Sequence, residues 1–184
     1  MDTAIPFTIR MLNPGDARAW AELRLEALET HPLAFGASLP GEFNDLVESA
    51  RDRLKVSEDS AAFGAFVDNT LVGTVGIRRE HGAKERHKCL LLAMYVRSEN
   101  RRTGVGESLV RSAIRHARSW EGVEQVLLVV NDVAQDAKRL YERLGFRTWG
   151  IEPRSLNWKG DYTNAVHMIF DLREGATTSG KLTI

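Results

Sequence analysis

Two unbroken apolar runs, with an amphipathic segment between them, dominate the hydrophobic pattern of the chain. The first run, residues 90–96 (LLLAMYV), does not alternate between polar and apolar positions, which predicts a strand buried on both faces. Residues 123–130 (VEQVLLVV) form a second strand of the same kind. Between them, residues 105–117 carry apolar side chains at offsets of three and four, which predicts a helix with one apolar face. A strand, a helix and a strand in this order predict a parallel pair joined by a right-handed crossover.

The pattern before the first run predicts a strand, two helices and a hairpin. Residues 7–11 are rich in β-formers, and Asn13-Pro14 then supplies a helix cap followed by a proline at the first helical position. That helix is expected to stop at His31-Pro32. The segments that follow are a loop at 33–40, a helix at 42–56, two strands at 61–67 and 71–77 around the turn Asp68-Asn69-Thr70, and a polar connection at 78–88.

After the second run the pattern predicts one more helix and a final pair of strands. Residues 134–144 carry a helical stripe, and Gly145 follows as a cap before Phe146 starts a strand. We expect residues 149–152 to be extended, residues 153–161 to form a polar loop, and residues 165–172 to be the last strand. Residues 173–184 have little to bury and are predicted to be a mobile tail, so the predicted domain comprises residues 1–172.

A glycine-containing turn joins the first run to the helix that follows it. Gly104 and Gly106 lack side chains, so backbone N–H groups can approach a ligand there. The positive end of the helix dipole lies at the same point, and Arg101 and Arg102 precede it, which predicts a phosphate site. A P-loop would need a lysine where Glu107 stands, and a dinucleotide fingerprint would need a third glycine at position 109.

The pattern R-x-x-G-x-G, from Arg101 to Gly106, resembles the coenzyme A pyrophosphate loop of the GNAT superfamily of N-acetyltransferases. About 30 residues later, a second segment is similar to the one that follows the fifth strand in that family. Its matching positions are Asn131, Ala134, Leu140, Tyr141, Gly145 and Phe146.

This resemblance implies an α/β fold of the GNAT type. The expected core is a central mixed, mostly antiparallel sheet of six or seven strands with about four helices, splayed between strands 4 and 5. The pantetheine arm of acetyl-CoA, the implied cosubstrate, would enter that gap and pair with the fourth strand as an added strand does. The residues implied to bind it are Met94, Tyr95, Val96, Arg101, Arg102, Thr103, Gly104, Val105, Gly106, Glu107, Ser108, Asn131, Ala134 and Ala137.

The resemblance also assigns chemistry to Tyr141, as the general acid near the sulfur; from its spacing alone, this residue could equally belong to the core. Asn131 could likewise be a turn former or a helix cap. Some family members carry a glutamate base early in the fourth strand, where this chain has Lys88, Cys89 and Leu90. A water chain to a more distant group is the alternative, with these candidate relays: Glu42, Glu80, Glu85 and His87. Cys89 is expected to be a small apolar core residue, and the histidines to be surface or loop residues: His31, His81, His87, His116 and His167.

The implied reaction is transfer of an acetyl group to a primary amine by direct attack in a ternary complex. We expect a small-molecule amine, bound by segments 27–54 and 153–164. These segments supply aromatic walls and carboxylates, namely His31, Phe35, Phe43, Trp158, Tyr162, Glu42, Asp45 and Asp161. The alternatives are a protein N-terminus or lysine as acceptor, and a coenzyme A-binding sensor without catalysis.

Composition narrows the partners. The 184 residues suit one domain, and 25 basic residues balance 25 acidic ones, so no global field favours nucleic acid. No apolar run approaches the roughly 20 residues that span a bilayer, and the N-terminus lacks the pattern of a signal peptide. With one cysteine and no metal-ligand spacing, we expect a cytoplasmic protein with neither a metal nor a membrane partner; a homodimer stays open.

Overall fold

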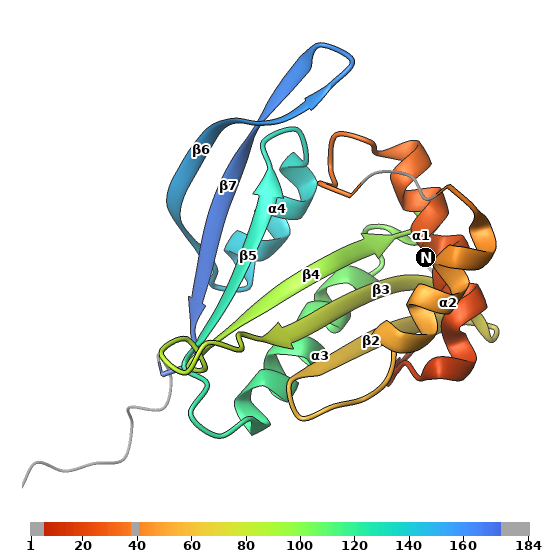
Figure 1. Ribbon diagram of the computed structural model, residues 1–184, viewed down its shortest axis with the longest axis horizontal. Helices are drawn as coiled ribbons and strands as arrows, with labels where there is room; N and C mark the ends of the chain where they lie inside the picture. Colours follow the sequence, from red (N-terminus) through yellow and green to blue (C-terminus); the bar gives the residue numbers. More distant parts are fainter. Residues whose placement is uncertain (1–5, 38–40, 174–184) are drawn as a thin grey trace, which may run out of the picture.

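A single seven-stranded sheet organises the computed structural model, which describes residues 6–37 and 41–173 (Figure 1). The strand order is β1-β2-β3-β4-β5-β7-β6, and every neighbouring pair is antiparallel except β4 and β5. The strands are β1 (Thr8–Met11), β2 (Ser60–Val67), β3 (Thr70–Arg79), β4 (Lys88–Val96), β5 (Gln125–Asn131), β6 (Arg147–Trp158) and β7 (Asp161–Asp171). The α-helices of the described ranges are α1 (Ala17–Thr30), α2 (Phe43–Arg53), α3 (Val105–Ser119) and α4 (Gln135–Arg143). The predicted mixed sheet with about four helices is confirmed.

Two apolar cores lie on opposite faces of this sheet. Helices α3 and α4 pack against one face, where the predicted stripe of α3 is buried throughout: Val105, Leu109, Val110, Ala113, Ile114 and Ala117. Helices α1 and α2 form the second core with strand residues that include Phe66, Leu71 and Tyr95. In Figure 1, α1 and α2 lie beside β2, β3 and β4, away from the β5, β7 and β6 end of the sheet.

Local signals before the first run are also confirmed. Asn13 and Asp16 form a reciprocal capping box around a 3₁₀ turn, Pro14–Asp16, which leads directly into α1. The β2–β3 hairpin turns at Asp68 and Asn69, whose φ angles of 46° and 64° are those of a tight two-residue turn.

Strands β4 and β5 are paired at one end only. Lys88, Cys89 and Leu90 pair with residues 125–127, and beyond that point the two strands separate (Figure 1). A β-bulge bends β4 at Ala93, which has a φ of 52°. The expectation that both runs are buried on both faces is therefore wrong: Leu92 is 37% exposed and Val129 is 57% exposed. Tyr95 and Val96 keep the end of β4 buried on both faces, whereas Leu92 and Val129 border the gap.

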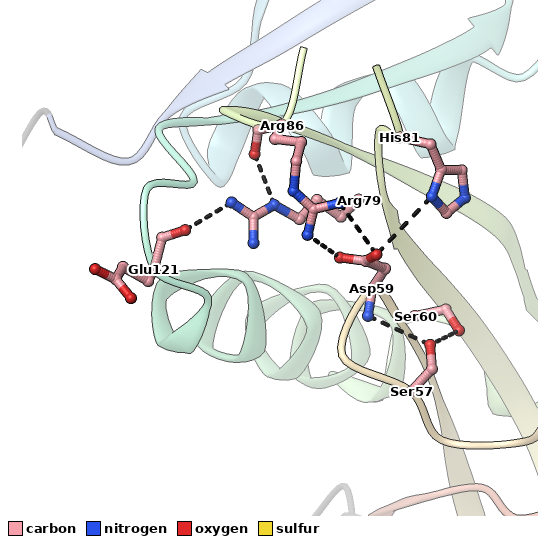
Figure 2. Close-up of polar contacts among 7 residues, drawn as sticks. All are labelled: Ser57, Asp59, Ser60, Arg79, His81, Arg86 and Glu121. Atoms are coloured by element: carbon pink, nitrogen blue, oxygen red, sulfur yellow. Dashed lines mark hydrogen bonds and ion pairs between the residues drawn. The ribbon is translucent and has the colours of Figure 1, made fainter. Parts of the chain in front are cut away.

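Polar contacts tie the chain together at the paired end of β4 and β5. The Arg79 guanidinium donates to the carbonyl oxygens of Arg86 and Glu121, both at 2.7 Å, and so joins the β3–β4 connection to the α3–β5 turn (Figure 2). Arg86 in turn makes two hydrogen bonds to the Asp59 carboxylate, at 2.8 and 3.2 Å. The backbone N–H groups of Glu124 and Gln125 both donate to the His87 carbonyl. These contacts hold the paired end closed.

The expected polar loop at 153–161 is wrong, because most of it belongs to a long hairpin. Strand β6 runs on to Trp158, and the turn falls at Lys159 and Gly160, with φ angles of 52° and 96°. The sequence signal failed because β6 is an edge strand with mostly exposed side chains, so it lacks alternation. Pro153 lies where the pairing of β6 with β7 is irregular. An edge strand tolerates a proline at such a position.

The predicted tail lies outside the described residues from 174 onward. Within residues 6–37 and 41–173, no helix has the length and apolar character needed to cross a membrane.

One partly buried histidine makes stability sensitive to acid. His116 of α3 lies edge-on between Phe63 and Trp120, with ring centroids 5.6 and 5.0 Å away, and its buried Nε2 has no hydrogen-bond partner. Burial lowers the pKa of His116 below its usual 6.5. The unfolded chain therefore binds this proton more readily than the folded chain, so stability falls as pH drops below 6.5 towards the folded-state pKa.

We expect the substitution His116→Phe, which keeps an aromatic ring in this position, to reduce that acid sensitivity. Urea unfolding at pH 8 and pH 5.5 measures it, and the shift in midpoint between the two pH values should be smaller in the variant than in the wild type. An equal shift in both proteins would show that His116 does not contribute to it.

Candidate active site

The separation of β4 and β5 opens a cavity of about 950 Å³. The glycine turn and the start of α3 line one part of it, and the α4 region lines another. The segment that follows α1 contributes His31, Ala34 and Phe35. Segments far apart in the sequence thus meet in one site.

The glycine turn presents backbone donors to this cavity. Gly104 is the residue before α3 and has a φ of 89°, a conformation that strongly favours glycine. A Cβ atom at Gly104 would meet nothing within 4 Å, so open space adjoins this turn. No side chain of the described residues caps α3, and Thr103 Oγ1 donates to the Asn100 carbonyl instead. The first-turn N–H groups lack helical partners and can bind an anion.

Gly106 serves a different purpose. A Cβ atom there would lie 3.2 Å from Leu140 and 3.3 Å from Met94, so the glycine lets α3 approach β4 and α4 closely. Gly104 thus gives the turn its conformation, and Gly106 gives it its close packing.

Strand β4 offers a free edge to the same cavity. Beyond Leu90 no described strand pairs with the side of β4 that faces β5, and residues 91–96 line the cavity. An extended ligand could therefore pair with this edge as an added strand. Because of the bulge at Ala93, its backbone groups do not follow a regular strand.

Charges around the cavity favour an anion. Its lining includes four arginines and two carboxylates: Arg101, Arg102, Arg139, Arg143, Glu107 and Asp136. Glu107 is paired with Arg111 at 2.8 Å, and Asp136 is paired with Arg139 at 2.7 Å. The Arg139 guanidinium is the main cause of the lowered pKa of Asp136.

Tyr141 lies at the wall of the cavity but is otherwise buried, with 5% of its surface exposed. Its ring contacts Phe146 edge-on, at a centroid distance of 5.6 Å. Burial raises the pKa of the Tyr141 phenol above its usual value of 10, so the hydroxyl keeps its proton at neutral pH. Tyr141 is thus both a core residue and a protonated group at the cavity.

Most residues implied by the family resemblance line this one cavity, and four do not. Those that line it are Met94, Tyr95, Val96, Arg101, Arg102, Gly104, Gly106, Glu107, Ala134, Ala137 and Tyr141. The four others are Thr103, Val105, Ser108 and Asn131. Val105 is a core residue of α3, and Asn131 donates through Nδ2 to the Leu33 carbonyl at 2.9 Å. That bond fastens the segment after α1 to the end of β5, across the gap.

His31, which we expected to be a surface or loop residue and a possible wall of the acceptor cleft, lies in the loop after α1 and lines the cavity. Its ring packs edge-on against Tyr95, and its Nε2 atom lies 3.4 Å from Arg101 Nη2. The spacing of the residues gave no sign of this, because the contacts join residues about 70 positions apart. Sequence reasoning also missed residues of the β5 and α4 regions that line the cavity, such as Val129, Val133 and Asp136.

The expected carboxylates of an acceptor cleft lie elsewhere: Glu42, Asp45 and Asp161 are exposed, and none of them lines the cavity. Of the expected aromatic residues, Phe35 lines the cavity whereas Phe43 packs with the α1–α2 core. Of the remaining candidates, His31 lines the cavity, whereas Trp158, Tyr162, Glu80, Glu85 and His87 lie outside the lining. Cys89 is buried, and burial raises the pKa of its thiol to about 12. The residues that the structure describes contain no group of acidic, histidine or cysteine side chains suited to a metal ion.

Comparison with known proteins identifies the class to which this cavity and fold belong. The model of the acetyltransferase (GNAT) family matches residues 20–146, so the chain belongs to that family of acyltransferases. Among curated relatives, a mycothiol acetyltransferase from Thermobispora bispora is 32% identical over 148 residues, which are 78% of this chain and 48% of that protein. Human N-acetyltransferase 8 is 33% identical over 97 residues, 52% of this chain and 42% of that protein. The chain thus spans at most about half the length of these relatives.

Solved structures share the fold. A putative acetyltransferase from Salmonella typhimurium, solved with acetyl-CoA, has a TM-score of 0.80 at 18% identity, with 96% of this chain and 99% of that chain covered. A GNAT-family acetyltransferase from Streptococcus pneumoniae has a TM-score of 0.78 at 22% identity, with 91% and 100% covered. At this level of identity the likeness confirms the predicted GNAT fold.

Proposed function

We propose that the protein transfers the acetyl group of acetyl-CoA to a primary amine by direct attack in a ternary complex. The observation that carries this proposal is the single cavity in which an uncapped helix N-terminus, a free strand edge and a protonated phenol come together. The helix N-terminus suits the pyrophosphate, the strand edge suits the pantetheine arm, and the phenol suits the departing thiolate. The family membership and the acetyl-CoA of the Salmonella structure support the choice of cosubstrate.

In this proposal the glycine turn binds the pyrophosphate. The amides of residues 102–107 donate to its oxygens, and the arginines of the cavity wall add positive charge. The pantetheine arm pairs with the edge of β4 near Met94 and Val96, which brings the thioester to the bulged part of the strand. Ala134 and Ala137 have short side chains that leave room for the arm beside α4.

The chemical step needs a neutral amine whose lone pair attacks the thioester carbonyl. A C–N bond forms, the carbon–sulfur bond then breaks, and the electron pair leaves on sulfur. Backbone N–H groups near the bulge stabilise the developing oxyanion, and the Tyr141 hydroxyl supplies a hydrogen bond and a proton to the thiolate. The attacking nitrogen loses one proton as the amide forms, and this proton restores the phenol. This role fits a phenol that burial keeps protonated at neutral pH.

For the acceptor we favour a small-molecule amine. The Asn131–Leu33 hydrogen bond holds the segment after α1 across the gap, which leaves less room for a polypeptide than an open groove would. Exposed Leu92 and Val129 flank the gap and offer apolar contacts to the body of such an amine. A protein N-terminus or lysine is the alternative acceptor, and a non-catalytic coenzyme A sensor is the alternative function.

Free-thiol release from acetyl-CoA, measured over a panel of polyamines, amino acids, aminoglycosides and peptides, separates these readings. We expect release with one or more small amines and none with the peptides. Release with peptides alone would overturn the small acceptor. No release from a chain that binds acetyl-CoA in calorimetry would favour the sensor.

The proposed phosphate site predicts that Gly104→Val abolishes acetyl-CoA binding. The new side chain would enter the open space by the turn, and the positive φ of Gly104 would be strained. Gly160→Val is a matched control, because Gly160 also has a positive φ and open space but lies on the β6–β7 turn, outside the cavity lining. Calorimetry should show loss of binding only in the first variant. Equal acetyl-CoA affinity in a folded Gly104→Val protein would contradict this site.

The proposed acid predicts that Tyr141→Phe keeps the fold and acetyl-CoA binding but slows turnover by about 10- to 10⁴-fold, the range for one proton-transfer group. The ring contact with Phe146 needs no hydroxyl, so the unfolding midpoint should change little. Thiol release at saturating acetyl-CoA, with binding measured in parallel, is the test. Undiminished turnover would leave Tyr141 as a core residue only.

A further inference from the structure

Beyond the gap, one face of the sheet is left open by the helices that the structure describes. Alternate residues of β5 belong to the α3–α4 core, so Val129 between them points to the opposite face. Helices α1 and α2 lie on that side of the sheet, but their core contains no described residue of β5, β6 or β7 (Figure 1). Val129 is 57% exposed there and also lines the cavity. The cavity thus continues onto an open sheet surface.

The strand register places an imidazole and a carboxylate on this surface. His167 of β7 is the Cα partner of Val129, and Gly150 of β6 is the Cα partner of His167. Glu152 is the Cα partner of Ala165, which lies on the same face as His167 because the two are separated by one residue. His167 Nε2 lies 3.3 Å from Glu152 Oε2. A line of side chains therefore runs from the cavity wall at Val129, across His167, to Glu152.

A β-bulge adds an aromatic ring to the same surface. Thr148 and Gly150 pair with the consecutive residues Met168 and His167, so Trp149 is an extra residue in β6. A bulge of this kind redirects a side chain. The Trp149 ring lies 5.3 Å from the His167 ring, centroid to centroid, and Trp149 is 62% exposed. The bulge thus puts the indole on the open face beside His167.

An exposed indole near a carboxylate suits a cation. The face of an indole attracts a positive charge, and the carboxylate supplies the opposite charge. His167 leaves most of this carboxylate available, because it contacts one of the two oxygens and the Glu152 side chain is 56% exposed. An ionised carboxylate can accept several hydrogen bonds, so Glu152 can bind a ligand cation while it keeps His167.

The arginines of β6 lie away from this carboxylate. The Arg154 guanidinium lies over the Tyr162 ring, 4.0 Å from its centroid. Arg147 lies opposite Ile169, four residues along β7 from the partner of Glu152. The cation that this surface suits is therefore supplied by a ligand.

The distance to the gap sets the length of such a ligand. Neighbouring strands lie about 4.8 Å apart, so Glu152 on β6 is about 10 Å from β5, which forms one wall of the gap. The side chains that border the gap between these points are the apolar Leu92 and Val129. A molecule that reaches from the gap to Glu152 is therefore long, and its middle is apolar.

We infer that the acceptor amine carries a second cationic group, which Glu152 and Trp149 bind on the open face of the sheet. This inference rests on the acetyl transfer proposed above and narrows its acceptor. The reacting nitrogen lies in the gap, and the apolar chain crosses Val129. A nearby carboxylate favours the charged form of an amine, so the second group keeps its proton, whereas the attacking nitrogen must lose its own. Glu152 and Trp149 decide which amine binds and take no part in the chemical step.

The test compares three acceptors of equal length: octylamine, the diamine with an amino group at each end of an octane chain, and the amino acid with a carboxylate at the far end of that chain. Thiol release gives kcat/KM for each. In the wild type we expect the diamine to exceed octylamine by about 5- to 30-fold, the range for one exposed ion pair together with a cation–π contact. The amino acid should be the poorest acceptor.

Variants of Glu152 should change this order of preference. In Glu152→Gln the ratio of diamine to octylamine should fall below about threefold, and Trp149→Ala should lower it by a smaller factor. Glu152→Lys should reverse the order, so that the amino acid exceeds the diamine. A merely structural role of Glu152 would not reverse a preference for charge.

Two controls accompany these variants. Glu58→Gln removes an exposed carboxylate before β2, outside the cavity lining, and should keep the wild-type ratio. Ethylenediamine is too short to reach Glu152 from the gap, so its ratio to ethylamine should be the same in the wild type and in Glu152→Gln.

The outcomes separate this inference from the proposed function. Wild-type turnover in which octylamine or the amino acid equals the diamine would overturn the inference and leave the acetyltransferase standing. Turnover with other amines but none with the diamine would do the same, as would a diamine preference that persists in both Glu152→Gln and Glu152→Lys. An absence of wild-type turnover with every amine would remove both.

Discussion

The divergence of two parallel strands is the constraint on which the rest of this structure depends. Three residue pairs join β4 to β5. Beyond them the strands separate, so the edges with which they face each other no longer pair. A sheet rarely leaves buried backbone groups unpaired, because each unmet hydrogen bond is costly. The divergence persists because contacts at the paired end, centred on Arg79, hold three connections together while a bulge at Ala93 bends β4 away.

The same unmet backbone groups explain why a ligand belongs in the gap. The free edge of β4 and the uncapped first turn of α3 both offer groups that have lost their usual partners. Apolar side chains that would be buried in a closed sheet, among them Leu92 and Val129, are exposed beside them. An extended molecule with an anionic end satisfies all of these requirements, which is why one coenzyme can occupy the whole cavity in our proposal.

Charge is distributed unevenly around the cavity. The arginines outnumber the carboxylates, and both carboxylates of the lining are already paired. Two other groups of the lining are kept neutral: burial lowers the pKa of the His31 imidazole and raises that of the Tyr141 phenol. In our proposal the fixed positive charges bind the anionic end of the coenzyme, and the neutral phenol of Tyr141 supplies the proton.

The sequence by itself determined the elements and their order, because helical and strand periodicity depend on neighbouring residues alone. The apolar stripe of α3, the capping box of Asn13 and the hairpin turn at Asp68 and Asn69 are all local features, and the structure confirms them. The family resemblance likewise rested on two short segments, and most of their residues meet in one cavity. Local signal was missing for edge strand β6, whose side chains are mostly exposed and therefore do not alternate.

The tertiary structure alone decided which face of an apolar strand is core and which is cavity wall. Continuous apolar runs have the same composition in a closed sheet and in a splayed one, so the exposure of Leu92 and Val129 could not be predicted. The contacts of His31 were equally hidden, because they are made with Tyr95 and Arg101, which only folding brings to the end of α1. Burial and the charge of a distant arginine set the properties of that imidazole, and neither is encoded in the residues next to it.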